Sequence, residues 1–175
     1  AVMCRTFSSM NRLEQVALKH CQGRILDVGA GSGTHSLILQ KRHLPVTAID
    51  LSVGCVAAMV QQGIEDVRHA NLFTLPAERF DTILLLMNGM GICGSLDGLN
   101  LFFQFIPTIL APGGQILADS TDLSVLYDSP PTRDTQFTMI YQNINGDPFD
   151  WLYIDFDTLS FYAAIHGFTC ERLSG

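Results

Sequence analysis

Apolar runs alternate with helical patterns over the first two thirds of the chain. Short apolar segments predict buried strands at residues 24–28, 46–50, 65–69, 80–87 and 115–119. Between them, apolar residues recur at helical spacing and predict helices near residues 9–21, 34–42, 52–63 and 97–110. Ser8 or Ser9 can cap the first of these helices. This order predicts a Rossmann-like α/β fold, a doubly wound and mostly parallel sheet with helices on both faces.

The pattern changes near residue 127. Residues 135–142 and 149–154 predict two strands around Asn145 and Gly146, a pair typical of turns, and therefore a β-hairpin. A helix at 155–166 and a strand at 168–173 are predicted to follow. We expect a single domain over residues 1–175, with an N-terminal helix region at 1–22 and a hairpin insertion at 127–154.

Composition narrows the function classes. The formal net charge is -7 and basic residues form no cluster, which argues against a nucleic-acid partner. The apolar runs at 83–87 and 99–110 are too short or too interrupted to span a bilayer, so no membrane segment is expected. The five cysteines are scattered and never in C-x-x-C spacing. This favours a reducing compartment, with the cytoplasm as the expected location, over disulfides or a metal site.

A glycine loop follows the first predicted strand and opens a helix. Its sequence, from Asp27 to Gly33, is Asp-Val-Gly-Ala-Gly-Ser-Gly. Glycines permit a tight turn and a close approach of backbone to ligand, and the helix N-terminus favours an anionic group. Dinucleotide sites have the spacing G-x-G-x-x-G, whereas this loop has G-x-G-x-G with Thr34 at the place of the third glycine. A tight turn without a ligand is the alternative interpretation.

Polar residues follow the next three strands. Asp50 ends the second strand and can accept the ribose hydroxyls of an adenosyl group, or it can cap a helix. Asn71 can bond the amino group of adenine while apolar neighbours such as Leu72 flank the ring, or it can stabilise a turn. Met87 and Asn88 follow the central strand and can offer backbone groups to a cofactor. Asn88 can also orient an acceptor, and it is the one candidate for a catalytic role.

Other side chains allow two interpretations each. His35 can face a cofactor, although a packed or surface histidine is favoured, and Arg5 can pair with a cofactor carboxylate. Asp119 can form part of an acceptor site or cap a loop. For Trp151 and Tyr153, core packing and substrate contact are equally expected.

Taken in order, these segments resemble the motifs of the class I S-adenosylmethionine-dependent methyltransferases. The resemblance covers residues from about 10 to 120 and includes 80–91 and the Leu-Ala-Pro-Gly-Gly run at 110–114. It implies that Asp27 and residues 29–33 surround the methionine moiety, that Asp50 holds the ribose, and that Leu51 and Asn71 contact the adenine. The expected cofactor-binding set is Asp27, Gly29, Ala30, Gly31, Gly33, Asp50, Leu51, Asn71, Leu72, Met87 and Asn88. The expected cofactor is S-adenosyl-L-methionine, with S-adenosyl-L-homocysteine as product.

The chain departs from that family in two places. No Asn-Pro-Pro-aromatic sequence follows the central strand, which argues against methylation of a base amino group or a glutamine amide. The family's sheet normally ends with an antiparallel strand after the one predicted at 168–173, and no residues remain to form it. We expect the chain to continue beyond residue 175. The hairpin or a second chain can fill the gap instead, which leaves a homodimer open.

The sequence therefore predicts a methyltransferase that transfers a methyl group from S-adenosylmethionine to a small-molecule acceptor by in-line displacement. A non-catalytic, methyltransferase-like binding protein is an alternative, because no general base can be named. An NAD(P)-dependent oxidoreductase is a further alternative, against which the glycine spacing counts.

Overall fold

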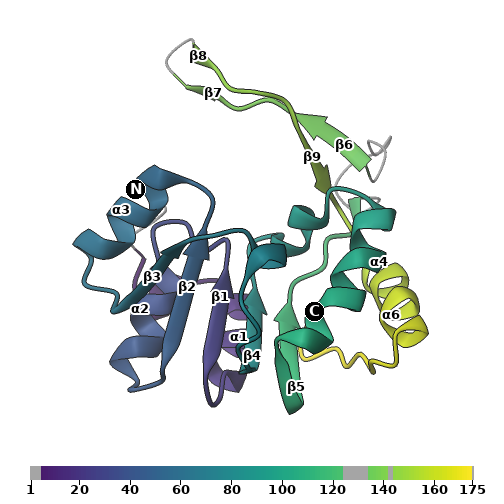
Figure 1. Ribbon diagram of the computed structural model, residues 1–175, viewed down its shortest axis with the longest axis horizontal. Coiled ribbons are helices and arrows are strands. Elements are labelled where there is room, and N and C mark those ends of the chain that lie inside the picture. Colours follow the sequence, from purple (N-terminus) through teal and green to yellow (C-terminus); the bar gives the residue numbers. More distant parts are fainter. Residues whose placement is uncertain (1–4, 124–133, 142–143, 175) are drawn as a thin grey trace. The chain divides into compact units, whose positions relative to one another are not determined.

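The computed structural model describes residues 5–123, 134–141 and 144–174 (Figure 1). The chain divides into two compact units, which are described separately. The first unit comprises Ala1–Leu86, Ile106–Ala118 and Arg172–Gly175, and the second comprises Met87–Phe105 and Asp119–Glu171. The single domain expected over residues 1–175 stays a prediction.

The first unit contains a five-stranded parallel sheet with the strand order β3-β2-β1-β4-β5. Its strands are β1 (Ile25–Val28), β2 (Val46–Asp50), β3 (Asp66–His69), β4 (Phe80–Leu85) and β5 (Leu110–Ala118). β1 and β4, at the centre, are almost entirely buried, as their mostly apolar sequences predict. The order reverses beside β1, which is the switch point where ligands bind in such sheets. A Rossmann-like sheet flanked by helices is thereby confirmed.

Helices α1 (Arg12–His20), α2 (Thr34–Lys41) and α3 (Val53–Gln61) pack against this sheet. One core cluster joins Leu18 of α1 and Leu39 of α2 to Ile25 and Leu84 of the sheet. A second joins α3 to β2 through Met59. Each fully buried leucine or isoleucine contributes about 1.5–3 kcal/mol, so these clusters fix the helices that flank the glycine loop.

The cap of α1 differs from the prediction. Ser8 and Ser9 lie in the 3₁₀ turn η1 (Phe7–Ser9), and Asn11 is the N-cap instead. The Asn11 side chain accepts from the Glu14 N–H at 2.8 Å, and the Glu14 carboxylate accepts from the Asn11 N–H at 3.2 Å. This reciprocal capping box satisfies two N–H groups at once, which a lone serine cannot do.

The described residues of the second unit form the 3₁₀ turn η3 (Gly89–Cys93), helices α4 (Leu96–Phe105) and α6 (Phe156–Ile165), and four short strands. The antiparallel pairs are β6 (Asp134–Phe137) with β9 (Phe149–Leu152) and β7 (Ile140–Tyr141) with β8 (Ile144–Asn145). The predicted hairpin is confirmed, but the strand expected at 135–142 is interrupted after Phe137. The turn expected at Asn145 and Gly146 is wrong, because Asn145 lies in β8 and pairs with Ile140 of β7. The sequence also predicts a loop at Pro130 and Pro131, but these residues lie outside the described part of the chain.

The strand predicted at 168–173 is wrong. Residues 168–174 have no regular secondary structure. Gly167 ends α6 in a left-handed conformation with φ +80°, and the Phe168 N–H returns to the Ala163 carbonyl at 3.0 Å. The Phe168 ring then packs against Phe103 of α4, with the ring centres 5.4 Å apart. Phe168, which in sequence is typical of a strand, therefore belongs to the C-terminal cap of α6.

In the parts of the chain that the structure describes, no helix is both long and apolar enough to cross a membrane.

Candidate functional site

The glycine loop connects β1 to α2 as predicted. Gly29, Gly31 and Gly33 have φ values of +64°, +60° and +80°, which other residues rarely adopt. The Ala30 N–H donates to the Ile49 carbonyl at 3.0 Å, and the Gly33 N–H donates to the Ala30 carbonyl at 2.8 Å. The loop is thus held between the ends of β1 and β2 by its own backbone.

The three glycines have different surroundings. A Cβ at Gly33 would lie 2.1 Å from Ile64 Cδ1 and 2.8 Å from Met59 Cγ, so this glycine lets α2 pack closely against its neighbours. A Cβ at Gly29 or at Gly31 would meet no atom within 4 Å. The backbone at Gly29 and Gly31 therefore faces open space, where a ligand can approach it.

Asp50 ends β2 and holds the loop. Its Oδ2 accepts from the Gly31 N–H at 2.9 Å, and its Oδ1 accepts from the Ser52 N–H at 2.8 Å. The loop contact comes from strand adjacency, because β1 and β2 are parallel neighbours and their carboxyl ends meet. An ionised carboxylate has about four acceptor positions, so Asp50 keeps acceptor capacity for a ligand.

Asp27 lies beneath the loop and is only 3% exposed. The Ser36 hydroxyl donates to its Oδ2 at 2.6 Å. Burial raises the pKa of Asp27, and His35 and the hydrogen bonds from Ser36 oppose that shift. A desolvated carboxylate in this position has a strong electrostatic preference for a cationic group.

The predicted adenine side is formed at the ends of β2 and β3. Leu51 is 66% exposed, so its side chain is accessible beside Asp50, whereas Leu72 is buried. The Asn71 Oδ1 accepts from the Phe73 N–H at 3.0 Å and caps the 3₁₀ turn η2 (Leu72–Thr74). This is the turn-stabilising role that the sequence left open. Contact of Asn71 and Leu51 with adenine stays a prediction.

A buried ion-pair network beside the loop could not be predicted. Arg5 donates to both Glu14 oxygens at 2.8 and 2.6 Å, and His35 Nε2 lies 2.9 Å from Glu14 Oε1. Burial raises the pKa of Glu14, but hydrogen bonds from Arg5, His35 and the Asn11 backbone hold it below its usual value. His35 is therefore packed, as favoured, and Arg5 pairs with Glu14. The Asn-x-x-Glu spacing indicates the capping box of Asn11 and Glu14, but not the partners that the Glu14 carboxylate finds in Arg5 and His35.

In the second unit, the turn after β4 is strained. Met87 and Asn88 have φ values of +60° and +61°, and each such non-glycine residue costs about 1–3 kcal/mol. The Asn88 N–H donates to both Asp119 oxygens at 2.9 Å, and the N–H groups of Met87 and Gly89 also bond this carboxylate. Burial raises the pKa of Asp119, and these backbone bonds oppose the shift. Asp119 thus caps the loop, and the Met87 and Asn88 N–H groups are bonded within it.

The Asn88 side-chain amide is buried, and neither its nitrogen nor its oxygen has a hydrogen-bond partner among the described residues. Leaving such a group unpaired costs about 1–3 kcal/mol. The Trp151 indole packs over η3 so closely that a Cβ on Gly91 would lie 2.0 Å from its nitrogen. Trp151 therefore has a packing role, and its contact with a substrate stays a prediction.

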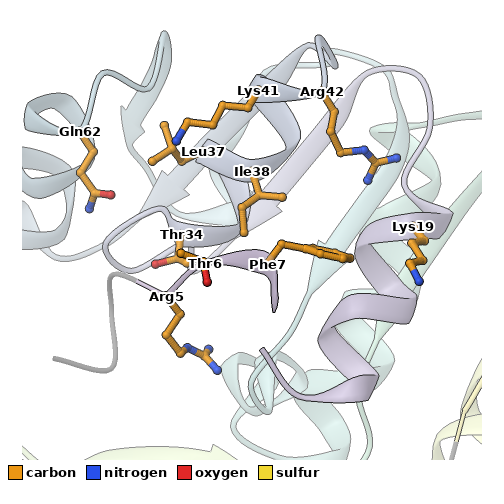
Figure 2. A pocket seen from close by; sticks show the side chains of 10 residues that line it. All are labelled: Arg5, Thr6, Phe7, Lys19, Thr34, Leu37, Ile38, Lys41, Arg42 and Gln62. Carbon is orange, nitrogen blue, oxygen red and sulfur yellow. The ribbon is translucent and has the colours of Figure 1, made fainter. Parts of the chain in front are cut away.

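A separate cavity of about 750 Å³ lies in the first unit. Figure 2 shows the side chains that line it: Arg5, Thr6, Phe7, Lys19, Thr34, Leu37, Ile38, Lys41, Arg42 and Gln62. None of the residues predicted to bind the cofactor lines this cavity. Within residues 5–123, 134–141 and 144–174, no cluster of three or more His, Cys, Asp or Glu side chains could hold a metal ion.

Comparison with known proteins adds independent information. The family described as "Methyltransferase domain" matches residues 25–114, which run from β1 into β5. The chain is similar to a SAM-dependent methyltransferase from Bacteroides fragilis, crystallised with S-adenosyl-L-homocysteine. The two sequences are 48% identical with a TM-score of 0.88, and the match covers 96% of this chain and 73% of that one. A search of curated proteins found no match.

Two more distant structures share the fold. The glycopeptide N-methyltransferase MtfA, in complex with S-adenosyl-L-methionine, is 14% identical with a TM-score of 0.62 over 89% of this chain and 81% of that one. The sugar N-methyltransferase KedS8 from a Streptoalloteichus species is 14% identical with a TM-score of 0.67 over 93% and 80% of the two chains. At these identities the similarity concerns the fold alone.

Proposed function

We propose a ligand site and an acceptor class for this chain, which belongs to the S-adenosylmethionine-dependent methyltransferase family. The proposed function is transfer of a methyl group from S-adenosyl-L-methionine to a small-molecule acceptor, with release of S-adenosyl-L-homocysteine. The observation that carries the proposal is the glycine loop. Its backbone faces open space at Gly29 and Gly31, and the buried carboxylate of Asp27 lies in the strand that leads into it. The relative crystallised with S-adenosyl-L-homocysteine supports this choice of ligand.

The first unit offers complementary groups for the ends of the cofactor. Asp27 and residues 29–33 would surround the methionine moiety, because a buried carboxylate suits an ammonium group and the start of α2 suits a carboxylate. Asp50 would accept the ribose hydroxyls with the lone pairs that Gly31 and Ser52 leave available. Leu51 and Asn71 would lie against the adenine.

Asn88 is the proposed acceptor-binding residue. Its amide carries both donors and an acceptor, and no described residue satisfies them. A small polar acceptor that offers the complementary groups would remove that cost. When bound, the cofactor supplies an electrophilic methyl group, and the protein contributes alignment and exclusion of water. Asn88 would hold the acceptor through hydrogen bonds of its side-chain amide.

The test is a methyl-transfer assay with labelled S-adenosyl-L-methionine and a fractionated pool of small metabolites containing amines and hydroxyls. We expect label in one low-molecular-mass fraction, and at least a tenfold lower rate for Asn88→Ala with the affinity for S-adenosyl-L-homocysteine changed less than twofold. Binding of the cofactor without transfer to any fraction would favour the non-catalytic binding protein. Equal rates for wild type and Asn88→Ala would remove Asn88 from the acceptor site.

A further inference from the structure

The cavity of about 750 Å³ is built from the N-terminal segment and three helices. Thr34, Leu37, Ile38 and Lys41 recur at helical spacing and form one face of α2. The segment that carries Phe7 lies opposite, and Lys19 comes from the last turn of α1 (Figure 2). Ligand cavities typically enclose about 300–1,000 Å³, so this one has room for a small organic molecule.

The charge of its lining is one-sided. Arg5, Lys19, Lys41 and Arg42 line the cavity, and none of the described residues that line it is acidic, although the chain has 17 acidic and 10 basic residues. Glu14 forms an ion pair with Arg5, whereas the described residues offer no ion-pair partner to Lys19, Lys41 or Arg42. Arg42 donates to the uncharged Leu18 carbonyl, and the Lys19 Nζ lies 5.9 Å from the centre of the Phe7 ring. The cavity therefore has a positive rim in a protein of net negative charge.

The floor of the cavity is apolar. Phe7, Leu37 and Ile38 are partly buried hydrophobic side chains that pack against the core and present their remaining surface to the cavity. An apolar floor below a cationic rim selects a ligand with an apolar body and an anionic end. A bare inorganic anion would leave the floor exposed to water, and a neutral apolar ligand would leave the rim charges unpaired.

Three lining residues also hold the glycine loop. The Thr34 hydroxyl oxygen lies 3.4 Å from the Ser32 hydroxyl oxygen, and the Gln62 amide donates to the Ser32 carbonyl at 2.6 Å. Arg5 reaches the second residue of α2 through Glu14 and His35. A ligand that displaces these side chains must therefore change the free energy of the loop conformation.

We propose that this cavity binds a small organic anion with an apolar body, such as a medium-chain carboxylate, and that this ligand alters cofactor affinity at the glycine loop. The second half rests on the proposed function. The coupling is reciprocal, so the cofactor and the anion change each other's affinity by the same factor.

The first experiment measures binding of octanoate to the full chain by calorimetry without cofactor. Octylamine is the matched ligand with the same apolar tail and the opposite charge, and acetate is the matched ligand without the tail. We expect octanoate to bind at least tenfold more tightly than either. The double variant Lys19→Gln/Lys41→Gln should lose at least tenfold in octanoate affinity, whereas Arg12→Gln, on α1 and outside the cavity lining, should lose less than twofold.

Absence of octanoate binding at 10 mM, or equal binding of octylamine, would overturn the site. Equal losses of octanoate affinity in the double variant and in Arg12→Gln would show that octanoate binds elsewhere on the protein.

The second experiment measures the Kd of S-adenosyl-L-homocysteine with and without saturating octanoate. We expect at least a threefold change in wild type that is absent in the double variant. An unchanged Kd would overturn the coupling. Failure of S-adenosyl-L-homocysteine to bind in the absence of octanoate would refute the proposed function. The first experiment would still test the cavity, because it measures octanoate binding without cofactor.

Discussion

Three glycine-to-alanine substitutions distinguish a glycine that faces open space at the proposed ligand site from a glycine that is required for packing. Gly31, Gly33 and Gly63 are all left-handed, with φ values of +60°, +80° and +81°. A Cβ at Gly31 or Gly63 would meet nothing within 4 Å, but at Gly33 it would lie 2.1 Å from Ile64 Cδ1. Gly63 lies outside the loop, at the end of α3, and is the matched control for backbone strain.

The structure sets the expected stability losses. An alanine in the left-handed region costs about 1–2 kcal/mol, and the less flexible unfolded chain returns about 0.4–1 kcal/mol. Gly31→Ala and Gly63→Ala should therefore each lose about 1 kcal/mol of unfolding free energy. Gly33→Ala adds overpacking of about 1–3 kcal/mol, because Ile64 and Met59 must move. Urea unfolding measures all three losses.

Gly31→Ala and Gly63→Ala should lose similar stability but differ in their affinity for the cofactor. The methyl group of Gly31→Ala enters the space where the cofactor would approach the backbone, so we expect S-adenosyl-L-homocysteine to bind at least tenfold more weakly, about 1.4 kcal/mol. Gly63→Ala should bind within twofold of wild type in the same calorimetric titration. Normal binding by Gly31→Ala would show that the open space at this loop is not the ligand site. A Gly33→Ala variant as stable as Gly31→Ala would refute the packing argument.

Three further substitutions test the site. Asp50→Ala should weaken binding of S-adenosyl-L-homocysteine by about 1.5–3 kcal/mol in calorimetry, because the ribose hydroxyls lose a charged acceptor. An unchanged Kd would show that Asp50 only accepts hydrogen bonds from the Gly31 and Ser52 N–H groups. Glu14→Gln should lose about 3–5 kcal/mol of unfolding free energy in urea, because it breaks a buried ion pair. The control Glu78→Gln, in a more exposed ion-pair network, should lose much less. Similar losses in the two variants would contradict the claim that burial strengthens the Glu14 ion pairs. Because burial raises the pKa of Asp27, the folded chain holds this proton to higher pH than the unfolded chain, and stability falls as pH rises above the usual aspartate range. Asp27→Asn has no such carboxyl, so the melting temperature of this variant relative to wild type should rise between pH 4 and pH 8, while its affinity for S-adenosyl-L-homocysteine falls. A difference in melting temperature that stays constant across this pH range would contradict the prediction.

The parallel sheet and its order of elements could be predicted because both depend on local patterns. β4 ends in the apolar run Ile83–Leu85, and such a run fits a central parallel strand. The glycine loop could be placed because its residues fill the short connection from β1 to α2. Ser52 and Asp155 were also predictable as the starts of their helices, because each carries a capping side chain before an apolar pattern.

Features that depend on long-range contacts could not be predicted. The segment after Gly167 is apolar enough for a strand, but Phe168 finds its partner in Phe103 on α4. Glu14 is separated from His35 by 21 residues, and no local rule indicates that they meet. Likewise, Asp119 reaches Asn88 across 31 residues. Periodicity reports which face of an element is buried, but not which polar groups pair across the fold.

Calorimetric titration of the full chain with S-adenosyl-L-homocysteine tests whether the glycine loop binds the cofactor. We expect binding in the micromolar range, about -7 to -9 kcal/mol, with a matching rise in melting temperature. Absence of both heat and a thermal shift at millimolar ligand would contradict it.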